Sequence, residues 1–280
     1  MVNDILRSAA TQLTDSPEPL LDARVLLAHA AGVRDSALLF RDLTESEKKT
    51  FDGYIALRKK GMPVAYILKE KEFMGFSFYV DENTLIPRPD TECLVERVLE
   101  RAAHAPRILD LCAGSGCIGI SLALMIPGSE VLLTDISGGA LKAAAVNIKR
   151  HRLESRVSEK KLNVLTEDFP AGFNIIVSNP PYIPTDTAKS LEVSKSEPFS
   201  ALDGGADGLK FYREIIKKSA AALAEDGLLA LEIGFDQGES VKALALEYFR
   251  CAEVFRDYAD NDRVVICSFK DSAIKIGENV

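Results

Sequence analysis

From about residue 85 onwards, short apolar runs alternate with longer segments whose apolar residues recur at helical spacing. This alternation restricts the fold more than any other feature, because a strand, a helix and another strand in succession build a parallel sheet with right-handed crossovers. It predicts strands over residues 107–111, 130–134, 157–162, 174–178, 228–233, 252–256 and 264–269. It predicts helices over residues 91–103, 117–125, 139–151, 209–224 and 238–248.

The end of this alternation is different, because only the turn-rich segment DYADNDR separates the last two predicted strands. Two strands joined so closely form an antiparallel hairpin. We therefore expect an α/β fold with a seven-stranded, mostly parallel, doubly wound sheet and a C-terminal antiparallel hairpin at one edge. Such an ending is unusual for a dehydrogenase.

Roughly the first 60 residues carry helical signals only. Ser16 followed by Pro17 predicts the start of one helix, and Thr44 with Glu47 forms a capping box that predicts another. Residues 61–83 then alternate aromatic and β-branched residues, which predicts a short hairpin. Three parts follow: a helical domain over residues 1–65, a β-hairpin linker over residues 66–84 and an α/β domain over residues 85–280.

Charge and cysteine usage restrict the partners. A net charge of −8 and a pI near 5.1 argue against binding to nucleic acid phosphates, which requires clustered Lys and Arg. The five cysteines follow neither a disulfide framework nor a zinc spacing, so we expect no metal site and a reducing compartment. The N-terminus lacks the apolar core of a secretory signal, and the longest apolar stretch, residues 108–126, contains an aspartate and three glycines. A soluble, cytoplasmic protein without a membrane or direct DNA partner is expected.

A glycine loop lies between the first predicted strand and the following helix. Gly114, Gly116 and Gly119 match the G-x-G-x-x-G pattern of dinucleotide sites, and Asp135 ends the next strand. Asp110, just before the loop, would repel a pyrophosphate by about 1 kcal/mol per charge at 4 Å in water, and by more in a partly buried cleft. S-adenosyl-L-methionine carries no phosphate but an ammonium and a sulfonium, so we interpret the loop as its site, with Asp135 as acceptor for the ribose hydroxyls. A tight turn without a ligand is the alternative.

The third predicted strand contributes Asn163, whose amide, or the backbone of the following Val164, would meet the adenine. Asn163 as a simple turn residue is an equally open interpretation. The product of the reaction would be S-adenosyl-L-homocysteine. The predicted cofactor residues are Asp110, Cys112, Ala113, Gly114, Ser115, Gly116, Asp135, Asn163, Val164 and Asn179.

Asn179, Pro180, Pro181 and Tyr182 follow the fourth strand, at the edge of the sheet where the cofactor crevice is expected. Prolines lack an N–H group and fix φ, so this loop offers rigid carbonyl acceptors. The Asn179 side-chain oxygen and the Pro180 carbonyl can accept both hydrogens of a planar –NH₂ group, and Tyr182 can pack on its flat face. We interpret these residues as a substrate clamp for an amide-like nitrogen, with Asn179, Pro180 and Tyr182 catalytic through positioning. An ordinary Asn-Pro turn is the alternative.

Further motifs are PVAYI with Glu72-Phe73, TLIPRPDTECLVE, DLCAGSGCIGISLA, EPFSALDGGADGL and RDYADNDRVV. With them the chain resembles the release factor glutamine methyltransferases, the PrmC or HemK family, over nearly its whole length. The resemblance implies a Rossmann-like class I methyltransferase domain behind a helical domain and a hairpin. It implies N5-methylation of the glutamine in the Gly-Gly-Gln motif of peptide chain release factors, with the glycine loop and Asp135 binding S-adenosyl-L-methionine and residues 179–182 holding the glutamine.

Some positions depart from the family pattern. Cys112 stands where many members have the first glycine of the loop, and Lys69 replaces a usual glycine in the linker. Arg88 lies in a segment that resembles a family loop over the cofactor, but an exposed arginine is usually just solvated, so its role stays open.

Three other functions are alternatives. A methyltransferase for a glutamine of a large-subunit ribosomal protein is poorly separated by sequence. An adenine-N6 or cytosine-N4 nucleic acid methyltransferase would carry a basic recognition region, which the chain lacks. A binding module without catalysis would show a broken glycine loop or clamp, and both are intact.

Overall fold

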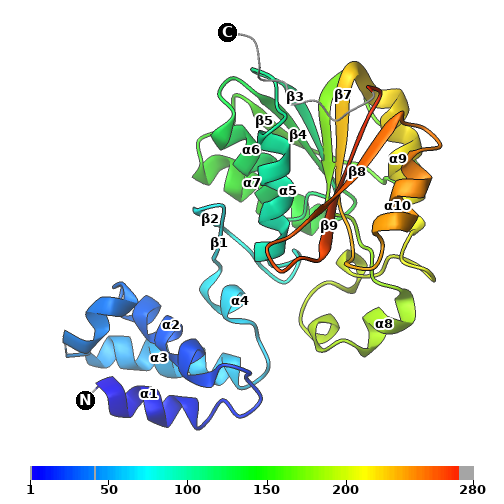
Figure 1. Ribbon diagram of the computed structural model, residues 1–280. Helices are drawn as coiled ribbons and strands as arrows, with labels where there is room; N and C mark the ends of the chain where they lie inside the picture. Colours follow the sequence, from blue (N-terminus) through cyan, green and yellow to red (C-terminus); the bar gives the residue numbers. More distant parts are fainter. Residues whose placement is uncertain (1, 41, 271–280) are drawn as a thin grey trace. The chain divides into compact units, whose positions relative to one another are not determined.

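A computed structural model describes residues 2–40 and 42–270 of the chain (Figure 1). The chain divides into two compact units, Met1–Glu70 and Lys71–Val280. This division differs from the sequence-based boundaries at residues 65 and 84, because the hairpin expected as a linker lies within the second unit. The roles assigned to the three parts stay a proposal.

The regular elements among the described residues of the first unit are all helices, and they enclose a core of apolar side chains that includes Leu26, Leu27 and Phe51. Its elements are α1 (Val2–Ala10), α2 (Pro19–Ala30), the 3-10 helix η1 (Asp35–Phe40), α3 (Glu45–Arg58) and α4 (Val64–Leu68). The capping box at the start of α3 is confirmed. Thr44 Oγ1 accepts the Glu47 N–H at 3.3 Å, and Glu47 Oε2 accepts the Thr44 N–H at 2.7 Å.

Two local predictions in this region are wrong. Helix α2 begins at Pro19 rather than Pro17, because the Ser16 hydroxyl accepts the Glu18 N–H at 3.1 Å and donates to Asp22 at 2.6 Å instead of capping a helix at residue 17. Residues 64–68 form α4 rather than a strand. Their apolar side chains pack into the helical core, and Lys69, in the left-handed region at φ 56°, ends the helix.

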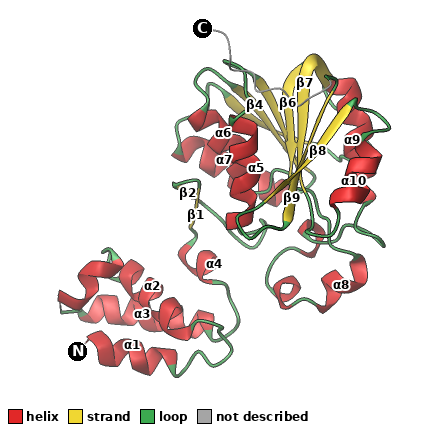
Figure 2. Cartoon of the chain, in the orientation of Figure 1, coloured by secondary structure: helices red, strands yellow, loops and turns green. Residues whose placement is uncertain are grey.

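The second unit contains the seven-stranded sheet, in which five strands are parallel and the last two form an antiparallel hairpin at one edge (Figure 2). The strand order is β5-β4-β3-β6-β7-β9-β8. The strands are β3 (Arg107–Leu111), β4 (Glu130–Asp135), β5 (Val157–Lys161), β6 (Phe173–Ser178), β7 (Leu223–Glu232), β8 (Cys251–Arg256) and β9 (Asp262–Ser268). The predicted fold class is confirmed.

Helices cover both faces of this sheet (Figure 1). One face packs against α5 (Glu92–Leu99), α6 (Cys117–Met125) and α7 (Gly138–Arg150), together with the hairpin of β1 (Lys71–Phe73) and β2 (Phe76–Phe78). The other face packs against α9 (Lys210–Ala222) and α10 (Gly238–Ala245). Helix α6 is apolar nearly all round because α5, α7 and the sheet all contact it.

The segment between β6 and α9 holds elements that the sequence pattern did not predict. They are α8 (Thr185–Ser190), η3 (Glu192–Lys195) and η4 (Phe199–Ala201); η2 (Pro89–Thr91) precedes α5. Strand β7 starts at Leu223, within the segment predicted as helix, because Leu223 pairs with Phe173. In the described part of the chain, no helix has the length and apolar character of a membrane span.

Candidate active site

The carboxyl ends of β3, β4, β5 and β6 border one cavity of about 240 Å³ in the second unit. Most of the predicted site residues line it: Cys112, Ala113, Gly114, Ser115, Asp135, Asn163, Val164, Asn179 and Pro181. Asp110, Gly116, Pro180 and Tyr182 do not form part of its wall. The structure therefore brings the glycine loop and the Asn-Pro-Pro-Tyr loop together at one cavity, although they follow different strands.

The glycine loop turns sharply from β3 into α6. Gly114 and Gly116 have φ of +56° and +79°, in the region where a side chain is strained. Gly119 has a different role, because a Cβ there would lie 2.4 Å from Leu133 Cδ2 and would push α6 away from the sheet. Cys112 also has a positive φ, +57°, which explains why a glycine suits this position.

Asp110 lies behind the loop and is fully buried. Its Oδ2 accepts the Gly119 N–H at 2.9 Å, whereas Oδ1 is buried without a hydrogen-bond partner. Burial raises the pKa of Asp110 to about 7; the negative charge of Asp135 adds to this rise and the Gly119 bond opposes it. A carboxylate in such surroundings favours a cation nearby. Direct contact of Asp110 with a ligand stays a prediction.

Asp135 and Asn163 each support the backbone beside the cavity. Asp135 accepts the N–H of Gly114 at 2.9 Å and of Ser137 at 2.8 Å, and burial raises its pKa. Asn163 Oδ1 accepts the Leu165 N–H at 3.0 Å, which is the turn geometry that the sequence left open. Since Asn163 also lines the cavity, its contact with a ligand stays a prediction.

The Asn-Pro-Pro-Tyr loop is fixed from several sides. Asn179 Nδ2 donates to Thr91 Oγ1 at 3.3 Å, and the Tyr182 hydroxyl donates to Glu232 Oε1 at 3.3 Å. The Tyr182 carbonyl accepts Gln237 Nε2 at 3.0 Å. A Cβ on Gly204 would lie 2.7 Å from the Tyr182 backbone, so this glycine of the GGADG segment lets the two loops approach closely.

Sequence reasoning missed Glu197 and Glu232 as site residues. Glu197 is buried; its Oε2 accepts the Ile86 N–H at 2.9 Å and its Oε1 accepts Arg88 Nη2 at 2.5 Å. Arg88, whose role was open, is thus ion-paired and also lines the cavity. The pair joins two segments 109 residues apart in sequence. Periodicity gives no signal for it, although both residues lie in motifs that stood out.

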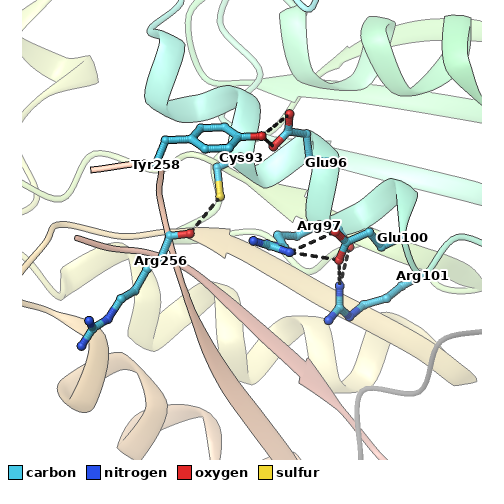
Figure 3. A network of polar contacts seen from close by, with 7 residues as sticks. All are labelled: Cys93, Glu96, Arg97, Glu100, Arg101, Arg256 and Tyr258. Atoms are coloured by element: carbon cyan, nitrogen blue, oxygen red, sulfur yellow. Dashed lines mark hydrogen bonds and ion pairs between the residues drawn. The ribbon is translucent and has the colours of Figure 1, made fainter. Parts of the chain in front are cut away.

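The end of β8 and the turn that follows it are attached to α5 (Figure 3). The Tyr258 hydroxyl donates to the Glu96 carboxylate at 3.0 Å, and Cys93 Sγ donates to the Arg256 carbonyl at 3.6 Å. Arg101 pairs with Glu100 and lies 4.6 Å from the centroid of the Phe255 ring. These contacts hold the helix that follows directly after Thr91.

The glycine loop follows β3, the acidic Asp135 ends β4, and both border one cavity. Together with the strand order, these features define a class I methyltransferase. Two family models match the chain: the PrmC N-terminal domain over residues 4–68 and the methyltransferase small domain over residues 89–196. The release factor glutamine methyltransferase of Clostridium acetobutylicum is 39% identical over 278 residues, which is 95% of this chain and 97% of that protein. The chain belongs to the family of release factor glutamine methyltransferases.

Other comparisons agree with this family. The release factor glutamine methyltransferase of Clostridium botulinum is 43% identical over 230 residues, covering 80% of this chain and 81% of that protein. The crystal structure of a methyltransferase from Pyrococcus furiosus superposes with a TM-score of 0.54 at 15% identity, covering 78% of this chain and 97% of that one. At this low identity the superposition supports the fold alone.

Proposed function

We propose that this protein transfers a methyl group from S-adenosyl-L-methionine to the side-chain amide nitrogen N5 of the glutamine in the Gly-Gly-Gln motif of peptide chain release factors. One observation carries the proposal. Asn179 and Pro181 line the same cavity as the glycine loop and Asp135, so a nitrogen held by the clamp lies next to a ligand held by the loop.

The residues around the cavity suit S-adenosyl-L-methionine. Ile136, Ala140, Val164 and Phe211 offer apolar surface for an adenine. Asp135 offers carboxylate oxygens to ribose hydroxyls. The buried Asp110 Oδ1 has no hydrogen-bond partner, and a positively charged ligand would favour the charged form of this carboxylate. The negative charges of these two acidic side chains would repel a pyrophosphate, which disfavours a dinucleotide. The cofactor, when bound, supplies a methyl group on a sulfonium, and the neutral thioether that remains, S-adenosyl-L-homocysteine, is a good leaving group.

The clamp residues act by positioning. Asn179 Nδ2 is engaged by Thr91, so Asn179 Oδ1 is the amide atom that can accept a substrate hydrogen. The Pro180 carbonyl can accept the second hydrogen, which directs the nitrogen lone pair toward the methyl group. Tyr182 packs beside the planar amide. No strong base is required, because the amide nitrogen can lose its proton after the methyl group has been transferred. Alignment alone can lower the barrier by an amount on the order of several kcal/mol.

The test is transfer of labelled methyl groups to four acceptors: a release factor, its Gly-Gly-Gln variant with the glutamine replaced by alanine, a large-subunit ribosomal protein and duplex DNA. The proposal predicts label on the unmodified release factor alone. Label on the ribosomal protein would move the substrate assignment there. Label on DNA, or on both release factor forms, would discard the assignment of the glutamine.

A further inference from the structure

Glu232 is a buried carboxylate behind the Asn-Pro-Pro-Tyr loop. It is the last residue of β7, it is 2% exposed, and it does not line the cofactor cavity. Its Oε1 accepts the Tyr182 hydroxyl at 3.3 Å, while Oε2 is buried without a hydrogen-bond partner. Burying a carboxylate this deeply is unfavourable, so the position calls for an explanation beyond packing.

Glu232 connects to both ends of the clamp. It contacts Tyr182 directly at one end. At the other end it lies beside the Thr91 hydroxyl, which favours the charged form of Glu232, and Thr91 Oγ1 in turn accepts Asn179 Nδ2 at 3.3 Å. Glu232, Thr91 and Asn179 come from β7, η2 and the end of β6, so the three meet only in the folded chain.

The direction of the hydrogen bonds follows from donor and acceptor chemistry. An ionised carboxylate only accepts, so the Tyr182 hydroxyl donates to Glu232, and the negative charge of Glu232 attracts the proton of the neighbouring Thr91 hydroxyl. The Thr91 oxygen is then left as an acceptor, and an acceptor selects the NH₂ end of the Asn179 amide. This leaves Asn179 Oδ1 as the amide end that can accept a hydrogen from the substrate. A protonated or amide side chain at position 232 can donate to Thr91 and removes this selection.

The surroundings of Glu232 hold its pKa near neutral pH. Burial raises its pKa to about 7, and Asp90 adds to the rise. Thr91, Arg263 and Tyr182 act in the opposite direction. Arg263 is itself held in place by Asp257 at 3.0 Å and by the Ile233 carbonyl at 3.3 Å. The Tyr212 hydroxyl donates to the Glu232 carbonyl at 2.9 Å, which fixes the backbone rather than the carboxylate.

We propose that ionised Glu232 is a positioning residue that, through Thr91 and Tyr182, orients the Asn179 amide for the substrate nitrogen. This inference rests on the proposed function of the clamp. It gives a role to Glu232, which lies outside the cavity wall and would act on the substrate only through other residues.

The test compares Glu232→Gln, Thr91→Val and Thr91→Ser with the wild-type enzyme, using labelled methyl transfer to an unmodified release factor at saturating S-adenosyl-L-methionine. Glu225→Gln, at an exposed position of the same strand, is the matched control for the charge change. We expect kcat to fall about tenfold or more in Glu232→Gln and Thr91→Val. The cofactor Kd should stay unchanged in Glu232→Gln, because Glu232 lies outside the cavity wall, whereas Thr91 lines the cavity. Thr91→Ser, which keeps the hydroxyl, should recover most of the rate lost in Thr91→Val.

The pH profile adds a readout that a purely structural role would not move. In the wild type, kcat should rise as pH increases through about 7, because Glu232 must be ionised, and this acidic limb should be absent in Glu232→Gln. Wild-type kcat and an unchanged pH profile in Glu232→Gln would overturn the inference, as would a loss that only follows a lower melting temperature. A wild-type enzyme that does not label the release factor would instead remove the proposed function itself.

Discussion

Cys112 carries a side chain in left-handed backbone geometry, at φ +57°, in the loop that borders the cavity. A side chain in this region is strained by about 1–2 kcal/mol, and a β-branched residue more so. Cys112→Gly relieves the strain but makes the unfolded chain more flexible, so it should change the unfolding free energy by less than about 1 kcal/mol. Cys112→Val should be destabilising by clearly more. Urea unfolding of both variants checks this, and equal stability of the two would contradict the strain argument.

Asn179 is the side chain on which the clamp depends. Asn179→Ala removes the acceptor for a substrate hydrogen and should lower kcat about 100-fold, because misalignment of the nitrogen is costly. Affinity for S-adenosyl-L-methionine should stay within about threefold, since most of the cavity wall comes from other residues. Calorimetric titration with the cofactor and labelled methyl transfer measure the two quantities separately. Unchanged turnover would refute the clamp.

At the scale of elements, the Arg88–Glu197 pair joins the segment before η2 to the segment before η4. Glu197→Ala leaves the Ile86 N–H without its acceptor and should destabilise the fold by about 1–3 kcal/mol. It should also speed cofactor release, because Pro87 and Pro198 from the two segments line the cavity. Stopped-flow release measures this. Arg88→Gln is the matched comparison: it removes the ion pair and keeps the Ile86 bond, so its loss of stability should be smaller.

The elements also show what the sequence could predict. Strand β3 and helix α6 have the bounds that periodicity predicted, because each is an apolar segment ended by local signals such as Pro106 and the glycine loop. The segment of α8, η3 and η4 has no such pattern, and contacts such as Glu197 with Ile86 hold it. The chain from Glu232 through Thr91 to Asn179 is invisible in sequence for the same reason, since its members come from three separate elements.

At the scale of the whole molecule, buried carboxylates make stability depend on pH. The pKa values of Asp110 and Glu232 are raised to about 7 from ordinary values of 3.8 and 4.5. Because the folded state holds these protons more tightly than the unfolded state, the stabilising contribution is complete when the pH lies below the ordinary pKa. It is lost as the pH rises toward and through 7. The melting temperature without cofactor should therefore fall between pH 5 and pH 8, where Asp110 alone accounts for a loss on the order of 3 kcal/mol. Asp110→Asn should reduce this slope; an identical slope in the variant would contradict the assignment.

The division into two units allows binding of cofactor and recognition of a protein substrate to be separated. Among the described residues, those that line the cavity all belong to the second unit, whose two apolar cores are formed within Lys71–Val280. We propose that the first unit docks the release factor, because its helix α2 exposes Leu20 and Leu21, at 48% and 46%, along with Val25.

A chain starting at Lys71 should therefore still bind S-adenosyl-L-methionine but lose methylation of the intact release factor. In the full chain, Leu20→Ser with Leu21→Ser should raise KM for the release factor about tenfold while kcat and cofactor affinity stay constant, because the clamp and the cavity are untouched. The full-length double variant controls for misfolding of the truncated chain. Full activity of the truncated chain on the release factor would show that the second unit alone recognises its substrate.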